Sequence, residues 1–212
     1  MYLSDLPGKA AHLKMAPEPR ILTLKTESAP PMGARDSAVL VLLFPSPDPK
    51  ELLDWEVIVI KRNTYEGVHS GQVAFPGGKC EESDKDYIAT ACREAFEELG
   101  IIKNKIEILG LMSRIYVPPS NFTIYPVLAY VKEDLKFVAD IREVAEFRKF
   151  PLSLFNPELS KTINISVSKD STIYAPSYII EDYTIWGATA MILAELYQLI
   201  VEDKLRISFN NP

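Results

Sequence analysis

The segment ACREAFEELG, residues 91–100, combines the apolar spacing of an amphipathic helix with three glutamates. Apolar side chains recur at every third or fourth position and predict one face that packs on a core. The members of this predicted face are Ile88, Ala91, Cys92, Ala95, Phe96 and Leu99. Glu94, Glu97 and Glu98 fall on a different, polar face, where residues three and four positions apart are neighbours. So much like charge within one turn of a helix requires an explanation.

Two explanations fit these residues when they are taken alone. In the first, the glutamates form a solvated acidic surface, because repulsion between such neighbours costs only about 0.2 to 0.5 kcal/mol per pair. In the second, they bind a hard divalent cation, which takes oxygen ligands and makes a carboxylate cluster favourable. The sequence next to the helix distinguishes the two explanations.

A glycine turn precedes the helix. Gly77 and Gly78 allow the backbone to turn tightly, and Arg93 can hold a carboxylate through a charge-assisted hydrogen bond. An enzyme that cleaves a diphosphate needs cations beside the phosphate oxygens, a group that activates water, and backbone close to the metal. Residues 77–98 contain candidates for each part, which favours a metal site.

The surrounding elements predict an α+β fold. One helix is expected at about 84–99, ending at Gly100 as a C-cap residue, and a last helix from residue 186 or 188 to 202. β-branched and aromatic runs predict strands. These runs lie at 37–44, 55–62, 71–78, 105–117, 123–131, 143–150, 162–167, 172–180 and 183–187. A mostly β chain with one central and one terminal helix is typical of a mixed sheet between helices.

We expect one domain, residues 35–212, preceded by an N-terminal arm, residues 1–34. A length of 212 residues suits a single well-packed domain. In the arm, a short helix is expected within residues 3–15, with His12 at the surface. The prolines of APEPR (16–20) and APPMGAR (29–35) are then expected to interrupt regular structure.

Charge and composition argue against several kinds of partner. A formal net charge of −6 and a pI near 5.1 disfavour broad attraction to nucleic acid or anionic lipid. The longest apolar run, AVLVLLF (38–44), is far shorter than the ~20 residues of a membrane-spanning helix. No signal-peptide pattern opens the sequence, so we expect a cytoplasmic protein. Cys80 lies in a loop and Cys92 on the apolar helix face, so both are expected to be free thiols.

The longer segment GGKCEESDKDYIATACREAFEELGI, residues 77–101, resembles the signature of the Nudix hydrolases, which joins a glycine turn, an acidic loop and a helix of pattern REUxEExGU. REAFEELGI (93–101) matches that pattern at every defined position. One residue more than the common spacing separates Gly78 from Arg93, and either Glu81 or Asp84 takes the place of the loop acid.

The sequence upstream is similar to the coenzyme A pyrophosphatase branch of that family, whose pattern is LLTxRSxxxRxxxGxxxFPGG. Counterparts here are Arg62, Gly71, Phe75, Pro76, Gly77 and Gly78, and His69 and Gln72 match common members. Gly67 stands where the branch has its second arginine, and Asn63 stands where it has a serine. Segments 118–131 and 185–193 also resemble strands and the last helix of the branch.

The resemblance implies a Nudix-like α/β/α sandwich with a mixed β-sheet, and Mg2+- or Mn2+-dependent cleavage of a pyrophosphate bond. It implies Glu94 and Glu98 as principal metal ligands and Glu97 as a third ligand or the catalytic base. The Gly77 carbonyl is a further implied ligand, and Arg93 is implied to hold Glu97. The implied substrate contacts are Arg62, His69, Gln72, Phe75 and Gly78.

The implied substrate is a small nucleoside diphosphate derivative. Coenzyme A or an acyl-CoA comes first, with 3',5'-ADP and a phosphopantetheine as products. ADP-ribose or another nucleoside diphosphate sugar is an alternative, because Gly67 removes a cation of the branch pattern. A non-catalytic, nucleotide-binding regulator is more remote, because all the carboxylates of the helix are retained. Glu143 is either an additional acid at the cleft or a solvent-facing residue, and the oligomeric state stays open.

Overall fold

The computed structural model describes residues 3–26, 29–47, 49–63, 71–132, 135–168, 171–205 and 207. The helices are α1 (Lys9–Lys14), α2 (Glu18–Thr26), α3 (Tyr87–Leu99) and α4 (Gly187–Val201). The strands are β1 (Arg35–Phe44), β2 (Glu56–Arg62), β3 (Val73–Ala74), β4 (Gly77–Lys79), β5 (Ile106–Leu111), β6 (Ile115–Val117), β7 (Phe122–Val131), β8 (Val144–Pro151), β9 (Lys161–Ser168), β10 (Ser171–Ile180) and β11 (Tyr183–Ile185). Within these ranges, no helix has the length and apolar character needed to cross a lipid bilayer.

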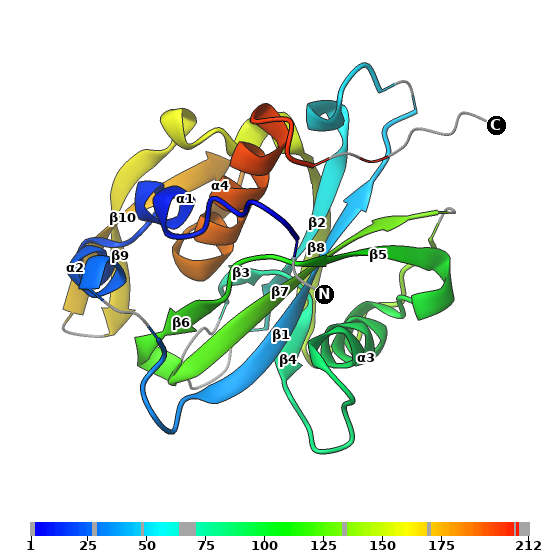
Figure 1. Ribbon diagram of the computed structural model, residues 1–212, viewed down its shortest axis with the longest axis horizontal. Coiled ribbons are helices and arrows are strands. Elements are labelled where there is room, and N and C mark those ends of the chain that lie inside the picture. The colour runs from blue at the N-terminus through cyan, green and yellow to red at the C-terminus, as the bar shows by residue number, and fades with distance from the viewer. Residues whose placement is uncertain are drawn as a thin grey trace.

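A mixed sheet forms the centre of the molecule (Figure 1). The strand order is β3-β2-β1-β7-β5, and β4 also pairs with β1, β6 with β7, and β8 with β2. Strands β1 and β7 are parallel, whereas the other pairs of this sheet are antiparallel. The runs LVLLF (40–44) and VIVI (57–60) in β1 and β2 are buried throughout, which is typical of strands covered on both faces.

Helices and a second sheet cover the two faces of the central sheet. Helix α3 lies on one face, while α1, α2, α4 and the sheet β11-β10-β9 lie on the other side (Figure 1). Each side has its own apolar cluster: Ala91, Ala95 and Leu99 of α3 belong to one, and Met191 of α4 belongs to the other. The predicted α/β/α sandwich with a mixed sheet is therefore confirmed.

The N-terminal segment packs into the second of these clusters. Met15 and Leu24 are buried in it, beside the side chains of α4. The expectation that APEPR interrupts regular structure is wrong, because α2 begins at Glu18. Pro19 lies in the first turn of that helix, where its missing N–H costs no intrahelical hydrogen bond.

A buried contact between two polar side chains ties the N-terminal segment to α4. His12 Nε2 lies 3.0 Å from Glu195 Oε2, and the Gly8 N–H donates to Glu195 Oε1 at 3.1 Å. Both side chains are inaccessible to solvent, so the expectation that His12 lies at the surface is wrong. The cause is a contact across 183 positions of sequence, which the local pattern around His12 does not contain.

Helix α3 begins later than the sequence suggested and buries a different face. Asp86 caps it by accepting a hydrogen bond from the Ala89 N–H at 2.8 Å, and Gly100 ends it in the left-handed conformation. Phe96, expected in the core, is 57% exposed, whereas Thr90 and Glu98 are buried. The buried face is rotated toward Glu98 because the glycine turn of β4 packs against that side of the helix.

The two cysteines are free thiols, as expected. Cys80 is half-buried and Cys92 is buried. Desolvation raises the pKa of both thiols above the ordinary value. Neither side chain therefore has the exposed, electropositive surroundings that activate a cysteine nucleophile.

Candidate active site

Gly77 connects the central sheet to the helix that follows it. Its φ of +155° is unfavourable for other residues, and a Cβ atom here would lie 2.4 Å from the Ala38 carbonyl oxygen and 2.6 Å from Val39 Cα. Only glycine fits between β1 and α3 at this point. The Gly77 N–H donates to Glu98 Oε2 at 2.9 Å, which fastens the turn to the helix.

Gly78 leaves room for a carboxylate. A Cβ atom on Gly78 would stand 2.4 Å from Glu94 Oε2 and 2.6 Å from Glu94 Oε1. The space beside the turn is thus filled by the Glu94 carboxylate, which donates no hydrogen bond and requires a donor or a cation nearby. Gly78, which the sequence suggested as a substrate contact, is thus also a glycine because a side chain there would collide with Glu94.

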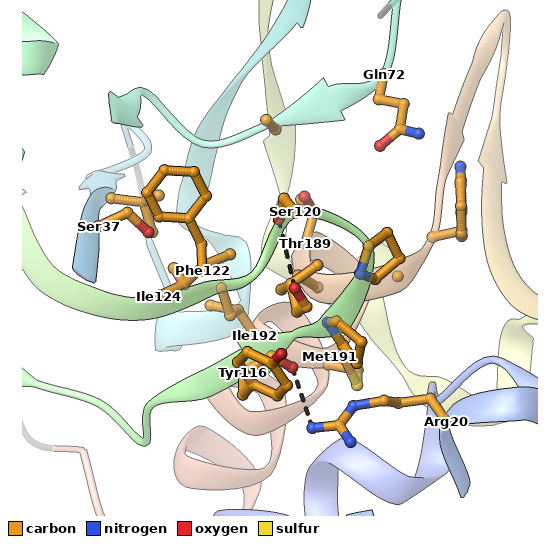
Figure 2. A pocket seen from close by; sticks show the side chains of 18 of the residues that line it. Arg20, Ser37, Gln72, Tyr116, Ser120, Phe122, Ile124, Thr189, Met191 and Ile192 are labelled. Atoms are coloured by element: carbon orange, nitrogen blue, oxygen red, sulfur yellow. Dashed lines mark hydrogen bonds between the residues drawn. The ribbon is translucent and has the colours of Figure 1, made fainter. Parts of the chain in front are cut away.

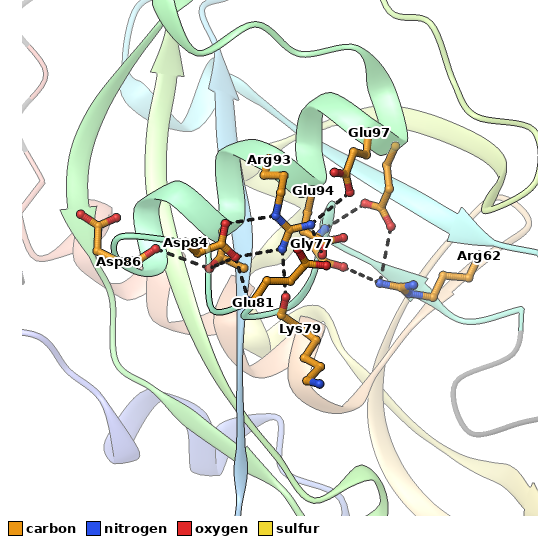
Figure 3. Close-up of polar contacts among 11 residues, drawn as sticks. Arg62, Gly77, Lys79, Glu81, Asp84, Asp86, Arg93, Glu94 and Glu97 are labelled. Carbon is orange, nitrogen blue, oxygen red and sulfur yellow. Dashed lines mark hydrogen bonds and ion pairs between the residues drawn. The ribbon is translucent and has the colours of Figure 1, made fainter.

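Arg93 holds three carboxylates at once (Figure 3). Its guanidinium donates to Glu94 Oε1 at 2.8 Å, to Glu97 Oε2 at 3.1 Å and to both oxygens of Asp84. It also donates to the Lys79 carbonyl at 3.0 Å. These hydrogen bonds raise the pKa of Arg93 further above its already high value and lower the pKa of Asp84 to about 2. Of the two loop acids that the sequence left open, Asp84 is therefore the one whose carboxylate contacts Arg93.

Glu98 is a buried carboxylate with one oxygen that accepts no hydrogen bond from the described residues. Its side chain is 1% exposed, although the sequence predicted a polar face. Oε2 accepts from the Gly77 N–H, whereas the partner of Oε1 within the described ranges is the Arg62 guanidinium, at 3.7 Å. Burial raises the pKa of Glu98 to about 7, and Arg62 and the Gly77 N–H oppose that rise. A buried carboxylate oxygen of this kind suits a cation as its partner.

Burial also raises the pKa of Glu94, and the exposed carboxylate of Glu143 adds to the rise at both Glu94 and Glu98. Glu143 therefore lies close enough for its charge to act on the cluster, although it stands just before β8 and not on the helix. The sequence left open whether this residue faces the cleft or solvent. In the structure it faces solvent at the edge of the cluster.

Arg62, at the end of β2, points toward the glycine turn. Its Nη2 donates to the Gly77 carbonyl at 2.8 Å (Figure 3). The carbonyl that the sequence suggested as a metal ligand thus accepts a hydrogen bond from a residue expected to contact substrate. A carbonyl oxygen has a second lone pair, which remains compatible with a further partner.

The donor set fits a divalent metal ion. Hard cations take carboxylate and carbonyl oxygens, and Glu94, Glu98 and the Gly77 carbonyl all surround the same turn. In the described part of the chain, no three acidic, histidine or cysteine side chains are placed so that they could hold one metal ion together. Glu94 and Glu97 are instead paired with the Arg93 guanidinium.

A cavity of about 790 Å³ opens beside the turn (Figure 2). It extends between β1, β7, α2 and α4, and most of its lining is apolar. Its charged residues are Arg20, Arg35, Arg62 and Lys79, and no acidic side chain is among the described residues that line it. The cavity therefore suits a ligand that is anionic and has an apolar body.

Most of the substrate contacts expected from the sequence line this cavity. Arg62, Gln72, Phe75 and Gly78 do so, although Phe75 is only 1% exposed and also belongs to the core. His69 lies outside the described residues, as does Gly67. The sequence did not single out Arg20, Arg35, Lys79 or Thr189, which also line the cavity.

Comparisons with known proteins agree with this geometry. Residues 34–169 match the NUDIX domain. The chain is 34% identical over 172 residues to the uncharacterized Nudix hydrolase NudL of Enterobacter sp. (strain 638), covering 78% of this chain and 82% of that protein. The corresponding protein of Shigella flexneri is 32% identical, with 78% and 83% covered.

Solved structures show the same fold. The Nudix hydrolase RenU of M. smegmatis superposes with a TM-score of 0.56 at 17% identity, covering 82% of this chain and 91% of that chain. A MutT/nudix family protein of Enterococcus faecalis gives a TM-score of 0.52 at 21% identity, with 95% and 76% covered. The NUDIX domain match and the relatives above 30% identity establish that the chain, whose fold these structures share, belongs to the Nudix hydrolases, an enzyme family of pyrophosphohydrolases that generally depend on a divalent metal.

Proposed function

We propose that this protein hydrolyses coenzyme A or an acyl-CoA at the pyrophosphate bond, giving 3',5'-ADP and a phosphopantetheine. The observation that carries the proposal is the position of the acidic cluster. Glu94 and Glu98 meet the Gly77–Gly78 turn at one end of a cavity that contains four cationic and, in its described lining, no acidic side chains. Phosphate oxygens bound in that cavity would lie beside the carboxylates that bind metal.

The proposed metal is Mg2+ or Mn2+, held by Glu94 and Glu98, with Glu97 as a third ligand or the base. Bound there, the cation would neutralise phosphate oxygens and lower the pKa of a water molecule. Arg93 positions these carboxylates through its contacts with Glu94 and Glu97. Water attacks one phosphorus, the bond from that phosphorus to the bridging oxygen breaks, and the leaving phosphate retains the bridging oxygen.

The choice of substrate rests on the sequence around the turn and on the charge of the cavity. Arg62, Phe75, Gly77 and Gly78 match the coenzyme A pyrophosphatase pattern. ADP-ribose or another nucleotide sugar is a second candidate, because the pattern's second arginine is replaced by Gly67. In both cases the bond that breaks and the roles of the carboxylates are the same.

A substrate panel tests the proposal. Coenzyme A, acetyl-CoA, dephospho-coenzyme A and ADP-ribose are incubated with the protein in Mg2+ or Mn2+, and the products are identified by mass. The expected result is 3',5'-ADP from coenzyme A, with loss of turnover in Glu98→Gln. A preference for ADP-ribose of a hundredfold or more in kcat/KM would transfer the assignment to nucleotide sugars, and failure to cleave any of the four would overturn it.

A further inference from the structure

Helix α2 forms the wall of the cavity that lies away from the glycine turn. Pro17, Pro19, Arg20 and Thr23 line the cavity at this end. In Figure 2, Arg20 lies across the cavity from Gln72, whose carbonyl accepts a hydrogen bond from the Arg62 N–H. Figure 1 likewise shows α2 and β4 well separated, with β6 and β7 between them. The cavity therefore spans from the metal-binding end to the N-terminal segment.

Arg20 is a fixed guanidinium at this far end. Its side chain is 8% exposed, and its Nη2 donates to the Tyr116 carbonyl at 3.0 Å. Its Nη1 donates to Thr23 Oγ1, and the guanidinium carbon lies 5.8 Å from the centre of the Tyr116 ring. These contacts hold the positive charge of Arg20 in one place before any ligand arrives, which reduces the entropy lost on binding.

The surface between the two ends is apolar. Phe122 and Ile124 of β7 face the cavity from one side, and Met191 and Ile192 of α4 line it from another (Figure 2). A ligand that extends from the glycine turn across this surface would bury an apolar portion against it. The group of the ligand beyond that apolar portion would then lie at Arg20. A fixed guanidinium favours an oxygen acceptor at that position, above all a charged one.

The position of this wall is set by the protein core. The buried contacts of Glu195 with His12 and with the Gly8 N–H fasten α1 to α4. Leu24 is buried in the same cluster as the side chains of α4. Helix α2 is thus held in place on both sides of Arg20, and the N-terminal segment is part of the cavity.

We infer that Arg20 is a specificity-determining residue of this enzyme, which binds a carbonyl or phosphate oxygen on the part of the substrate that is not attacked. The ligand class is a nucleoside diphosphate whose second phosphate carries a long arm. The reaction in this inference rests on the proposed function, whereas the binding contact of Arg20 is tested independently of cleavage. It adds that the N-terminal segment, and not only the Nudix signature, selects the substrate.

Equilibrium binding without metal separates the inference from hydrolysis. The dissociation constants of ADP, ADP-ribose, dephospho-coenzyme A and coenzyme A are measured by calorimetry in EDTA for the wild type and for Arg20→Met. Lys25→Met is the matched control, because it removes one positive charge from the exposed side of the same helix. Thr23→Val is a second variant that keeps Arg20 but removes the hydroxyl that accepts from its guanidinium.

We expect the wild type to bind coenzyme A more tightly than ADP. Arg20→Met should weaken coenzyme A binding at least tenfold and ADP binding less than twofold, with Thr23→Val showing a smaller loss of the same kind and Lys25→Met none. An equal loss for coenzyme A and dephospho-coenzyme A identifies the arm carbonyls as the partner, and a loss confined to coenzyme A identifies its 3'-phosphate. Both results support the inference.

Three outcomes would overturn it. The first is a wild type that binds coenzyme A no better than ADP. The second is an equal loss for every ligand in Arg20→Met. The third outcome applies if Arg20→Met does not fold, in which case Thr23→Val is the deciding variant. Unchanged coenzyme A binding by Thr23→Val would then overturn the inference. Because these are binding constants, they are independent of the hydrolysis panel: a protein that binds as expected but cleaves none of the compounds refutes the proposed function and leaves the inference standing.

Discussion

The Glu94 carboxylate occupies the space that a side chain at position 78 would need, with its Oε2 only 2.4 Å from the place of a Cβ on Gly78. The neighbouring Gly77 is confined in a different way, since its Cβ would meet the backbone of Ala38 and Val39. A side chain at position 78 would therefore collide with a flexible side chain, whereas a side chain at position 77 would collide with the rigid backbone of β1.

This difference predicts that alanine at position 78 impairs activity, whereas alanine at position 77 impairs stability. Gly78→Ala should leave the melting temperature within a few degrees of the wild type, because the Glu94 carboxylate can move. It should lower kcat about 100-fold, because Glu94, the proposed metal ligand, would be displaced from the reacting geometry. Gly77→Ala should instead unfold the protein at markedly lower temperature, because backbone cannot yield as a side chain does.

Thermal melting and kcat on the substrate found in the panel check both variants. Full activity of Gly78→Ala would show that Glu94 has no role at the turn. A Gly77→Ala protein as stable as the wild type would contradict the packing of β4 against β1.

Glu98→Gln should separate catalysis from folding. The amide oxygen can accept the Gly77 N–H as the carboxylate does, and it carries no charge into a buried site. The free energy of unfolding, measured by urea titration in EDTA, should therefore be no lower than that of the wild type. Turnover should fall at least about 100-fold, because a neutral amide is a poor ligand for a hard cation.

The control for Glu98→Gln is Glu107→Gln, which neutralises an exposed glutamate on β5 and should leave turnover unchanged. Activity of Glu98→Gln within threefold of the wild type at saturating Mg2+ would remove Glu98 from the metal site.

The sequence predicts those parts of this molecule that depend on neighbours along the chain. The central strands follow from the runs LVLLF and VIVI, which are apolar enough to be buried on both faces. The end of α3 follows from Gly100, whose left-handed conformation stops the helix. The site on α3 follows from the spacing of its glutamates and from Arg93, which binds the adjacent Glu94 and, one turn along the helix, Glu97.

Other features depend on partners that are distant in sequence. Helix α2 has a weak apolar pattern and two prolines near its start, and it is stabilised by packing against β10 and the core cluster of α4. The burial of Glu98 depends on the glycine turn, which brings a backbone N–H to a side chain that local periodicity assigns to solvent. The position of Arg20 in the cavity lining could not be predicted either, because it depends on distant contacts and nothing next to Arg20 in the sequence indicates a ligand.

The rotated face of α3 predicts unequal effects at two apolar positions. Leu99 is fully buried, so Leu99→Ala should lower the free energy of unfolding by about 2 to 5 kcal/mol. Phe96 is largely exposed, so Phe96→Ala should change it by less than about 1 kcal/mol. Urea unfolding of the two variants side by side is the measurement. A larger loss at Phe96 than at Leu99 would mean that the helix is rotated differently.

Asp84 should stabilise the protein in a pH-dependent way. Hydrogen bonds from Arg93 hold its folded-state pKa at about 2, below the ordinary value of 3.8. The stabilisation is therefore complete above pH 4 and is lost as the pH falls through 2. Because Arg93 is partly accessible to solvent, we expect a contribution of about 1 to 2 kcal/mol, less than the full shift would give.

Asp84→Asn should accordingly be less stable than the wild type at pH 7, with the difference shrinking between pH 4 and 2. Urea unfolding at pH 7, 4, 3 and 2.5 measures the difference. Glu81→Gln is the neighbouring control, because its side chain is exposed and the hydrogen bonds that join it to Asp84 are made by the Glu81 backbone N–H and carbonyl. A gap between wild type and Asp84→Asn that stays constant over this range would exclude the ion pair with Arg93 as its source.

The last prediction concerns the pair that joins the two ends of the chain. Glu195→Ala removes the acceptor for both His12 and the Gly8 N–H and leaves these buried groups without it. The free energy of unfolding should fall by at least about 2 kcal/mol. His12→Ala should also be destabilising, and the double variant should lose less than the two single losses combined, because they break the same interaction.

A double-mutant cycle in urea measures this coupling, with Glu202→Ala at the exposed end of α4 as a control that should leave the unfolding midpoint unchanged. Losses that add within about 0.5 kcal/mol would show that His12 and Glu195 stabilise the fold independently. In that case the N-terminal segment would be held by its apolar contacts alone, through Met15 and Leu24. A large coupling would instead make the pair the specific link that sets where α1 lies on α4, and thereby where α2 begins.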